Sequence, residues 1–361
     1  MAPFALEAEL GKFLAYTIYL LLGFGFGATL EMAGFANSPK LAAQFYFKDM
    51  TVLKVMFTAI VVAMVLIFGA SAVGVLDYNL LWVNPTYLWP GIVGGLIMGV
   101  GFIVGGFCPG TSLVAAATLK VDGLFFVLGV IFGIFLFGES VDGFAGFWNS
   151  SFQGRLTLPE WLGLSPGFVV VLVVLMALGM FWGGEQLERI FGGIDPSGAP
   201  TWRLYGAGGL VALSLAVLIV GQPTTEERWA RIADEKEAVL SAREVQIHAG
   251  ELFDLMNDNA YKPILLDYRS ERDYNLFHVR EAIHVAPTDA VDVAASLLLE
   301  PPNAVFVTMS NDETAATEAW KTLVAEGVPN VYILEDGING WLDLFAPELE
   351  GREGGDDELR Y

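Results

Sequence analysis

Long apolar segments with few charges alternate with short polar stretches over the first part of the chain. A helix needs about 20 apolar residues to cross the hydrocarbon core of a bilayer, and several of these segments approach that length. The clear segments cover residues 12–31, 53–76, 89–107, 124–138, 166–183 and 204–221. The pattern predicts an α-helical membrane domain over residues 1–222, followed by a domain of a different kind over residues 223–361.

Composition agrees with this division. The chain is 54% hydrophobic and its mean hydropathy is +0.54, which soluble domains rarely reach. The alternative, a large soluble protein with buried helices, fits the many glycines less well, because glycine is typical of closely packed membrane helices. The net charge is −22, and 29 of the 41 Asp and Glu residues follow residue 221. This acidity argues against nucleic acid and anionic lipid as partners of the second domain.

The membrane domain contains two related halves, over about residues 12–76 and 89–140, while the last two apolar segments are extra spans. Each half has a long apolar segment, a glycine-containing break, a short segment and a second long segment. Gly34-Phe35-Ala36 corresponds to Gly106-Phe107-Cys108, and Lys48-Asp49 to Lys120-Val121-Asp122. The alternative is chance similarity between two apolar stretches, but the matched order of breaks and polar residues favours an internal repeat.

The short segment after each break cannot span a membrane, so we expect two re-entrant half-helices. Ser38-Pro39 starts the first, with Ser38 as its cap, and Pro109-Gly110-Thr111-Ser112 starts the second. Irregular backbone at membrane depth is tolerated only beside protein or a water-filled cavity. Transporters direct such half-helix N-termini, each carrying roughly +0.5 charge, at anions near the bilayer midplane. We expect the two opposed ends to meet there around a small dianion.

Two charged residues flank the first break. Lys40 either leans over the anion site or extends to the membrane interface. Glu31 is either the partner of Lys40 or a group that lines the pore, because charges within membrane segments are costly and are usually functional.

Cys108 is the only cysteine of the chain, which excludes an internal disulfide, and no Cys/His cluster indicates a metal site. A single membrane cysteine is often a small packing residue. Cys108 instead stands at a break beside a predicted helix N-terminus, a position that favours a functional thiol. A thiol donates a weak hydrogen bond to a sulfur-containing ligand or exchanges with its sulfur.

Residues 30–35, 40–45 and 105–111 resemble the YeeE/YedE sulfur-transport family. The resemblance covers roughly residues 12–140 and implies uptake of thiosulfate or a related sulfur anion across the bacterial inner membrane. It also implies a narrow, hourglass-like path with a central cysteine, a role that only Cys108 can take here. Family members often have a further cysteine in the first half, where this chain has Ala36. We therefore expect a single central contact and no relay between thiols.

Residues from about 245 to 346 alternate short β runs with helices, which is typical of an α/β fold. Residues 266–271, 277–282 and 334–341 resemble rhodanese signatures. Rhodaneses transfer sulfur through a cysteine in the loop after a central strand, here residues 308–313, which contain no cysteine. Thr308 aligns with that cysteine, and Glu313 stands where the family often has a basic residue. The resemblance predicts a catalytically inactive domain whose degenerate loop residues are Thr308, Ser310, Asp312 and Glu313.

The sequence therefore predicts a multi-pass transporter for a sulfur anion in the bacterial inner membrane, with its C-terminal domain in the cytoplasm and no cofactor. The alternatives are a membrane-bound sulfurtransferase and a scaffold that recruits a sulfur-carrier protein; a homo-oligomer is a further candidate assembly. The residues expected to bind the anion are Glu31, Gly34, Ala36, Ser38, Lys40, Gly106, Cys108, Pro109, Gly110, Thr111 and Ser112.

Overall fold

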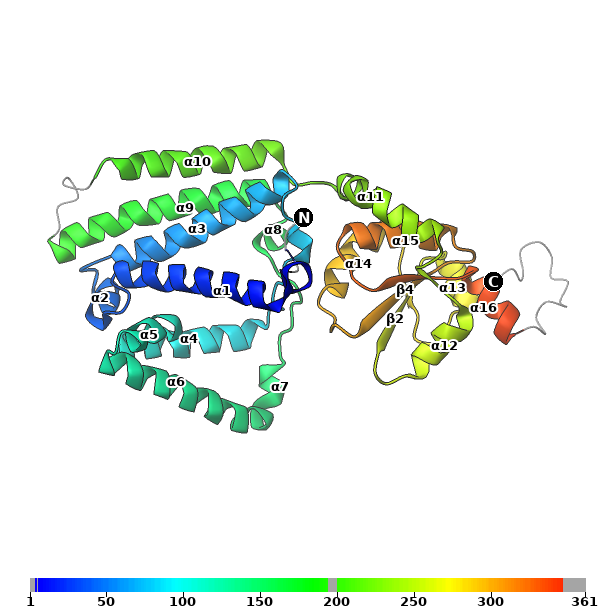
Figure 1. Cartoon of the computed structure of the whole chain (residues 1–361), viewed down its shortest axis with the longest axis horizontal. Helices are drawn as coiled ribbons and strands as arrows, with labels where there is room; N and C mark the ends of the chain where they lie inside the picture. Colours follow the sequence, from blue (N-terminus) through cyan, green and yellow to red (C-terminus); the bar gives the residue numbers. More distant parts are fainter. Residues whose placement is uncertain (1–3, 5, 194–199, 347–361) are drawn as a thin grey trace. The chain divides into compact units, whose positions relative to one another are not determined.

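The structure is a computed structural model that describes residue 4 and residues 6–193 and 200–346. It contains two compact units, and the chain passes from the helical unit to the α/β unit between Gln222 and Pro223. Figure 1 shows the helices and strands of both units.

Within the described residues, six helices of the first unit are long and apolar enough to cross a membrane. They are α1 (Leu6–Met32), α3 (Thr51–Ala72), α4 (Leu88–Gly105), α6 (Val121–Ser140), α9 (Pro166–Leu187) and α10 (Trp202–Val220). The predicted apolar segments are confirmed as helices, because each falls almost entirely within one of these six. Shorter helices join them: α2 (Ser38–Ala43), α5 (Pro109–Ala117), α7 (Ala145–Trp148) and α8 (Leu158–Leu162).

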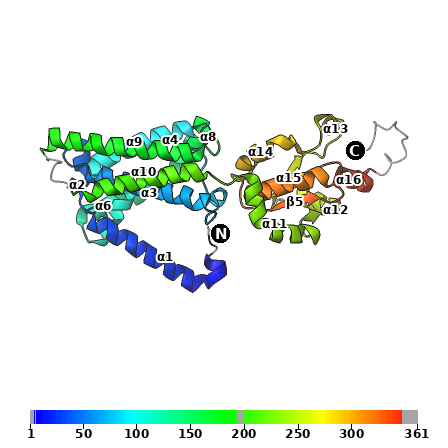
Figure 2. The same ribbon diagram turned by 90° about the horizontal axis from the view of Figure 1, so that it is seen from above.

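Helices α3, α9 and α10 run side by side in Figures 1 and 2 and share an apolar core. A Cβ atom on Gly167 of α9 would lie 2.8 Å from the Cα of Leu218 of α10, so glycine permits this close approach. Glu188, in the π-helical turn after α9, accepts hydrogen bonds from the Met50 amide at 2.6 Å and the Lys54 ammonium at 2.7 Å. These bonds fix the start of α3 to the end of α9.

The order α1–α2–α3 is repeated as α4–α5–α6, with the same backbone turns. Gly34 and Gly106 have φ of +81° and +72°, a region that glycine adopts without strain. Phe47 and Leu119, which follow the two short helical segments, have φ of 56° and 59°. The two halves therefore share both sequence pattern and local conformation.

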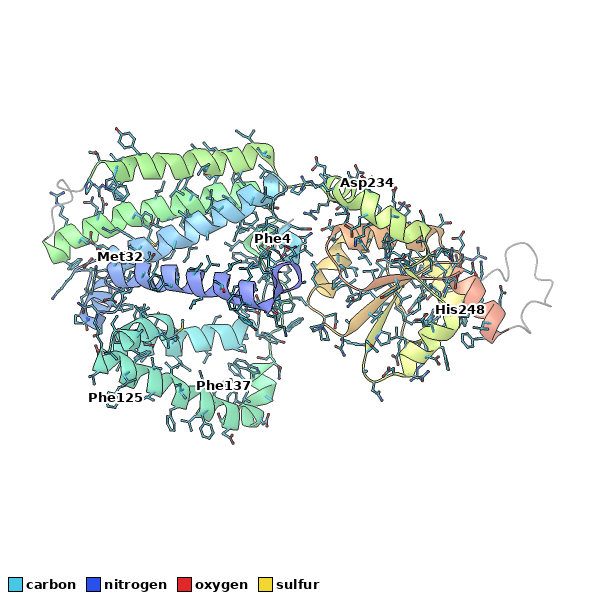
Figure 3. All side chains as sticks on the ribbon, in the orientation of Figure 1. Phe4, Met32, Phe125, Phe137, Asp234 and His248 are labelled. Atoms are coloured by element: carbon cyan, nitrogen blue, oxygen red, sulfur yellow. The ribbon has the colours of Figure 1, made fainter. Side chains whose placement is uncertain are left out.

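Both half-helices lie at the same end of the helical unit. Helix α1 contacts α5 and α2 contacts α4, while Met32 and Phe125 lie toward one end and Phe4 and Phe137 toward the other (Figure 3). The two half-helices thus lie at one end of the unit and are not opposed across it, while the expectation that their starts meet near the bilayer midplane stays a prediction. Helix α3 runs back along the unit, so α4 starts at the same end of the unit as α1. The 18 residues of α4 then extend about 27 Å before the second break.

The second unit is a five-stranded parallel sheet in the order β1-β5-β4-β2-β3. The strands are β1 (Gln246–Ile247), β2 (Lys262–Asp267), β3 (Ile283–His284), β4 (Ala304–Met309) and β5 (Val331–Leu334). The helices are α11 (Thr225–Ser241), α12 (Ala249–Asn257), α13 (Glu271–Leu276), α14 (Ala290–Leu297), α15 (Thr314–Ala325) and α16 (Gly337–Phe345). The predicted α/β class is confirmed.

Apolar residues cover both faces of this sheet, as parallel sheets require. Phe306 of β4 packs with Leu266 and Trp320 in one core, while its neighbour Val307 packs with Leu265 in the other. Alternate side chains along each strand thus supply the two cores.

Helix α11 belongs to this unit, although the α/β pattern in the sequence begins only near residue 245. Trp229 of α11 packs edge-on against Trp320, with ring centroids 6.0 Å apart. Arg228 pairs with Glu326 of the α15 end, and the Thr225 hydroxyl donates to the same carboxylate at 2.5 Å. The helix is amphipathic with a mainly charged surface, so its role as a packing element is visible only from the contacts.

Candidate functional site

Cys108 is the N-cap of α5, and its thiol lies at the start of that helix. The Thr111 amide donates to Sγ at 3.4 Å, the Thr111 hydroxyl lies 3.3 Å from Sγ, and the Cys108 amide donates to that hydroxyl at 3.0 Å. Pro109 follows as the first helical residue, where its missing N–H costs nothing. The thiol is only partly buried, so it combines a helix N-terminus with access for a ligand.

The two breaks touch each other. A Cβ atom on Gly106 would lie 2.9 Å from the Cβ of Ser38, so only glycine fits there, and its φ of +72° requires glycine as well. Phe35 and Phe107, the equivalent residues of the two breaks, are 0% and 1% exposed and belong to one apolar cluster. The cluster fixes the relative position of the breaks, and we call the contact between them the break junction (residues 33–40 and 106–112).

The start of α2 differs from the expectation. Its N-cap is Asn37, without a side-chain cap bond, and Ser38 and Pro39 follow as the first two helical residues. The Ser38 hydroxyl instead donates to Asp122 Oδ2 at 3.0 Å, at the start of α6. The prediction that Ser38 caps the half-helix is therefore wrong, because its side chain connects the two repeats.

Of the two alternatives for Glu31, an ion pair with Lys40 is wrong, and a pore-lining role stays a prediction. Lys40 Nζ donates to the Ala33 carbonyl at 2.8 Å and folds back over Gly34. Glu31 lies 3.9 Å from Lys120 Nζ, so Lys120, and not Lys40, is the ion-pair partner that the structure shows.

Lys120 itself was missed by the sequence reasoning. Its ammonium donates to the Ala36 carbonyl at 2.9 Å, which joins the start of α6 to the first break. The available signal was the repeat, which pairs Lys120 with Lys48, but the pairing alone does not reveal the contact across repeats.

The structure thus brings most of the predicted anion-binding residues to one place. Thr111 and Ser112 are buried in the first turn of α5, and Ser112 donates to the Pro109 carbonyl at 2.8 Å. Gly110 is exposed beside the thiol, with Sγ 4.0 Å from the position of a Cβ atom. The four degenerate loop residues lie in the other unit and form a separate site.

That loop begins later than expected. Thr308 and Met309 belong to β4, and Thr308 is fully buried with its hydroxyl bonded to the carbonyls of Ala316 at 3.1 Å and Tyr332 at 3.2 Å. The first loop residue is Ser310, whose hydroxyl accepts from the Ala316 amide at 3.0 Å. The assignment of Thr308 to the loop is wrong because β4 pairs with β5 through Thr308.

Backbone carbonyls, and not amides, dominate the contacts of this loop with α16. The Ile338 amide donates to Ser310 O at 2.8 Å and the Asn339 amide to Asn311 O at 3.1 Å. A Cβ atom on Gly337 would lie 2.5–2.6 Å from three loop carbonyl oxygens, so α16 starts directly against the loop. The N–H donors that a helix N-terminus offers to an anion are therefore engaged within the protein.

Charged groups surround the same loop. Arg243 pairs with Glu313 at 2.7 Å and with Glu335 at 3.1 Å, and these hydrogen bonds raise the pKa of Arg243. Glu313 also accepts from the Asp336 amide at 2.9 Å. The backbone amide and hydroxyl of Thr314 lower the pKa of Asp312, which keeps this carboxylate charged. The loop thus carries carboxylates, and that of Glu313 connects the loop to Arg243 and to the start of α16.

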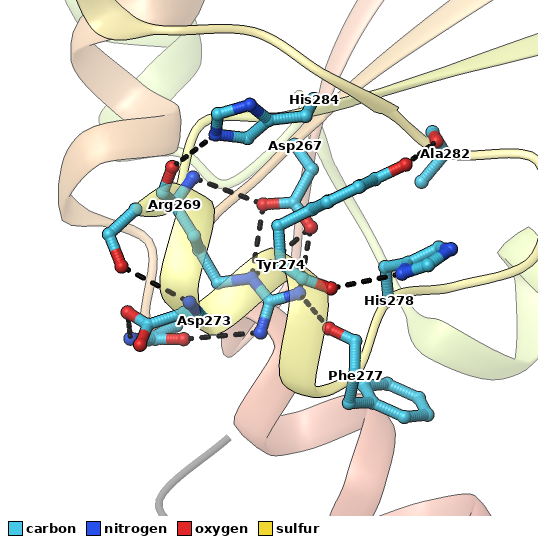
Figure 4. Close-up of polar contacts among 10 residues, drawn as sticks. Asp267, Arg269, Asp273, Tyr274, Phe277, His278, Ala282 and His284 are labelled. Carbon is cyan, nitrogen blue, oxygen red and sulfur yellow. Dashed lines mark hydrogen bonds and ion pairs between the residues drawn. The ribbon is translucent and has the colours of Figure 1, made fainter.

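A buried ion pair supports the neighbouring loop after β2 (Figure 4). Arg269 Nη2 lies 2.8 Å from Asp267 Oδ2 and donates to the Phe277 carbonyl at 2.5 Å, and the two charged side chains are 1% and 0% exposed. The arginine therefore holds the end of β2 and the end of α13 together.

The comparisons with known proteins agree with both units. A family model described as Sulphur transport matches residues 33–229, more than half of the chain, so the protein belongs to this family of membrane transporters. A Rhodanese-like domain model matches residues 248–344.

One curated relative is the probable transporter YedE of Escherichia coli (strain K12), 27% identical over 163 residues. The match takes in 44% of this chain and 38% of the relative, so the chain matches well under half the length of that protein. No solved structure matches the chain.

Proposed function

We propose that this protein carries thiosulfate or a related sulfur-containing anion across the bacterial inner membrane, through a constriction at the break junction. The observation that supports this most is the placement of the Cys108 thiol at the N-terminus of α5, where Gly106 meets Ser38. The thiol gives a soft contact for sulfur, and the first turn of α5 gives a positive end for the anion. The α/β unit lies on the cytoplasmic side in this proposal.

Uptake into liposomes tests the proposed transport. Full-length protein reconstituted into liposomes should take up labelled thiosulfate faster than labelled sulfate, because both are dianions and only thiosulfate presents a terminal sulfur to the thiol. Protein-free liposomes give the background for each anion. Equal rates for the two anions would remove the argument for sulfur recognition, and background rates for both would refute transport.

We further propose that the rhodanese-like unit does not transfer sulfur and instead recruits a sulfur-carrier protein. The unit contains no cysteine, and the amides of α16 bind the loop carbonyls. A cavity of about 600 Å³ includes Phe253, Met256 and Trp341 together with Arg280 in its lining. Aromatic side chains and an arginine are typical of protein interfaces, which supports a partner at this surface.

A sulfurtransferase assay separates this proposal from a membrane-bound sulfurtransferase. In that reaction a cysteine accepts the outer sulfur of thiosulfate and releases sulfite, and cyanide then removes the sulfur as thiocyanate. We expect the full-length protein to form no thiocyanate above the level of a Cys108→Ala variant. Formation that depends on Cys108 would favour the enzyme, since Cys108 is the one thiol present.

A further inference from the structure

Two lysines, one from each repeat, bind the same break. Lys40 donates to the Ala33 carbonyl at 2.8 Å, and Lys120 donates to the Ala36 carbonyl at 2.9 Å. The two ammonium groups therefore hold carbonyl oxygens three residues apart, within the junction that also contains Cys108. An ammonium has three N–H donors, and the carbonyl contact uses one of them on each lysine. The other donors of each lysine can bind an anion, and on Lys120 they also face Glu31.

The repeats are asymmetric at this point. Ala36 stands where the second repeat has Cys108, so one break supplies a thiol and the other supplies a carbonyl that positions an ammonium. Lys48 is the repeat equivalent of Lys120, but its side chain is exposed. The cation that reaches the Ala36 carbonyl thus comes from the second repeat, in addition to Lys40 of the first repeat.

The ion pair of Lys120 is long and accessible. Glu31 lies 3.9 Å from Lys120 Nζ, and the two side chains are 43% and 40% exposed. An exposed ion pair contributes little, so an incoming anion can replace the Glu31 carboxylate at modest cost. The other nearby carboxylate, Asp122, accepts from the Ser38 hydroxyl and the Gly123 amide.

From these contacts we infer that Lys120 is a selectivity residue for dianions, and that its ammonium exchanges Glu31 for the transported anion. With Lys40 it places two positive charges at the junction, which matches a doubly charged sulfur anion better than a singly charged one. This inference rests on the proposed transport function. It adds to the recognition by the thiol a specific residue that selects for the charge of the anion.

Kinetics of uptake by the full-length protein test the inference. Lys120→Gln keeps a donor for the Ala36 carbonyl and removes the charge, so the half-saturation concentration for thiosulfate should rise about tenfold or more. Glu31→Gln removes the competing carboxylate and should lower the same concentration by about two- to fivefold. Lys120→Arg keeps the charge and should restore most of the affinity.

Thiocyanate, a sulfur-containing monoanion, serves as a competing probe. Lys120→Gln should weaken inhibition by thiocyanate less than it weakens thiosulfate uptake, so the preference for the dianion falls. Lys48→Gln is the matched control and should change the half-saturation concentration by less than about twofold.

Two results would overturn the role of Lys120 in a protein whose wild type transports thiosulfate. In the first, Lys120→Gln weakens thiosulfate uptake and thiocyanate inhibition by the same factor; in the second, it changes neither. A Glu31→Gln variant with weaker thiosulfate uptake would refute the exchange. Absence of thiosulfate uptake by the wild type would instead refute the proposed function itself, so the two failures are distinguishable.

Discussion

Replacing Arg269 with methionine should destabilise the α/β unit by about 3–5 kcal/mol, because it leaves the Asp267 carboxylate buried without its ion-pair partner. Asp267 is fully buried, and the Arg269 side chain donates three hydrogen bonds to its carboxylate. The Phe277 carbonyl loses its donor at the same time. A domain of this size rarely has more than about 5–15 kcal/mol to lose, so much of its stability depends on this pair.

Amide hydrogen exchange of β2 and β4, measured on the full-length protein at increasing denaturant concentrations, gives the unfolding midpoint of the α/β unit. Arg280→Met is the matched control, because Arg280 pairs with Glu281 at 3.6 Å and both side chains are 88% and 79% exposed. The control should unfold like the wild type. Equal midpoints for both variants would show that the buried pair contributes no more than an exposed one.

Replacing Cys108 should separate two roles of its side chain. Cys108→Ala removes both the cap of α5 and the thiol, and thiosulfate uptake should fall at least about tenfold. Cys108→Ser keeps an acceptor for the Thr111 amide, since serine is a favoured N-cap. Its hydroxyl offers no soft contact to sulfur, so the preference for thiosulfate over sulfate should disappear even where α5 remains intact.

Uptake of both labelled anions by liposomes with equal protein content measures these changes. If Cys108→Ser keeps the wild-type preference, then capping α5 is the only role of this residue. If both variants transport thiosulfate as the wild type does, the thiol has no part in recognition.

The apolar pattern was sufficient to predict the six spans and the α/β class of the second unit, but not the packing of α11, whose surface is mainly charged. Apolar length determines which helices can cross a bilayer, and the strands around Leu266 and Phe306 are buried on both faces. The position of Cys108 at the start of a helix was also predictable, because proline is favoured in the first turn.

Other features depend on contacts that no local pattern contains. Lys120 reaches a carbonyl in the other repeat, and Ser38 binds Asp122 instead of capping its own helix. Both half-helices lie at one end of the unit because two long helices, α3 and α4, separate them. Apolar length alone does not show whether a short helix after a break counts as a further crossing. The sequence assigns Thr308 to the loop because it does not show where the strand ends. The strand extends to Met309 because Thr308 pairs with β5, which composition does not reveal.

In the proposed function, the Cys108 thiol contacts a sulfur anion at the break junction. Alkylation of the wild-type protein by a maleimide tests it most directly, since the chain has a single cysteine and the label reports on that site alone. The proposal predicts that thiosulfate slows the labelling in a concentration-dependent way, while equal concentrations of sulfate slow it much less. Labelling at the same rate with and without saturating thiosulfate, in protein that transports the anion, would contradict the claim.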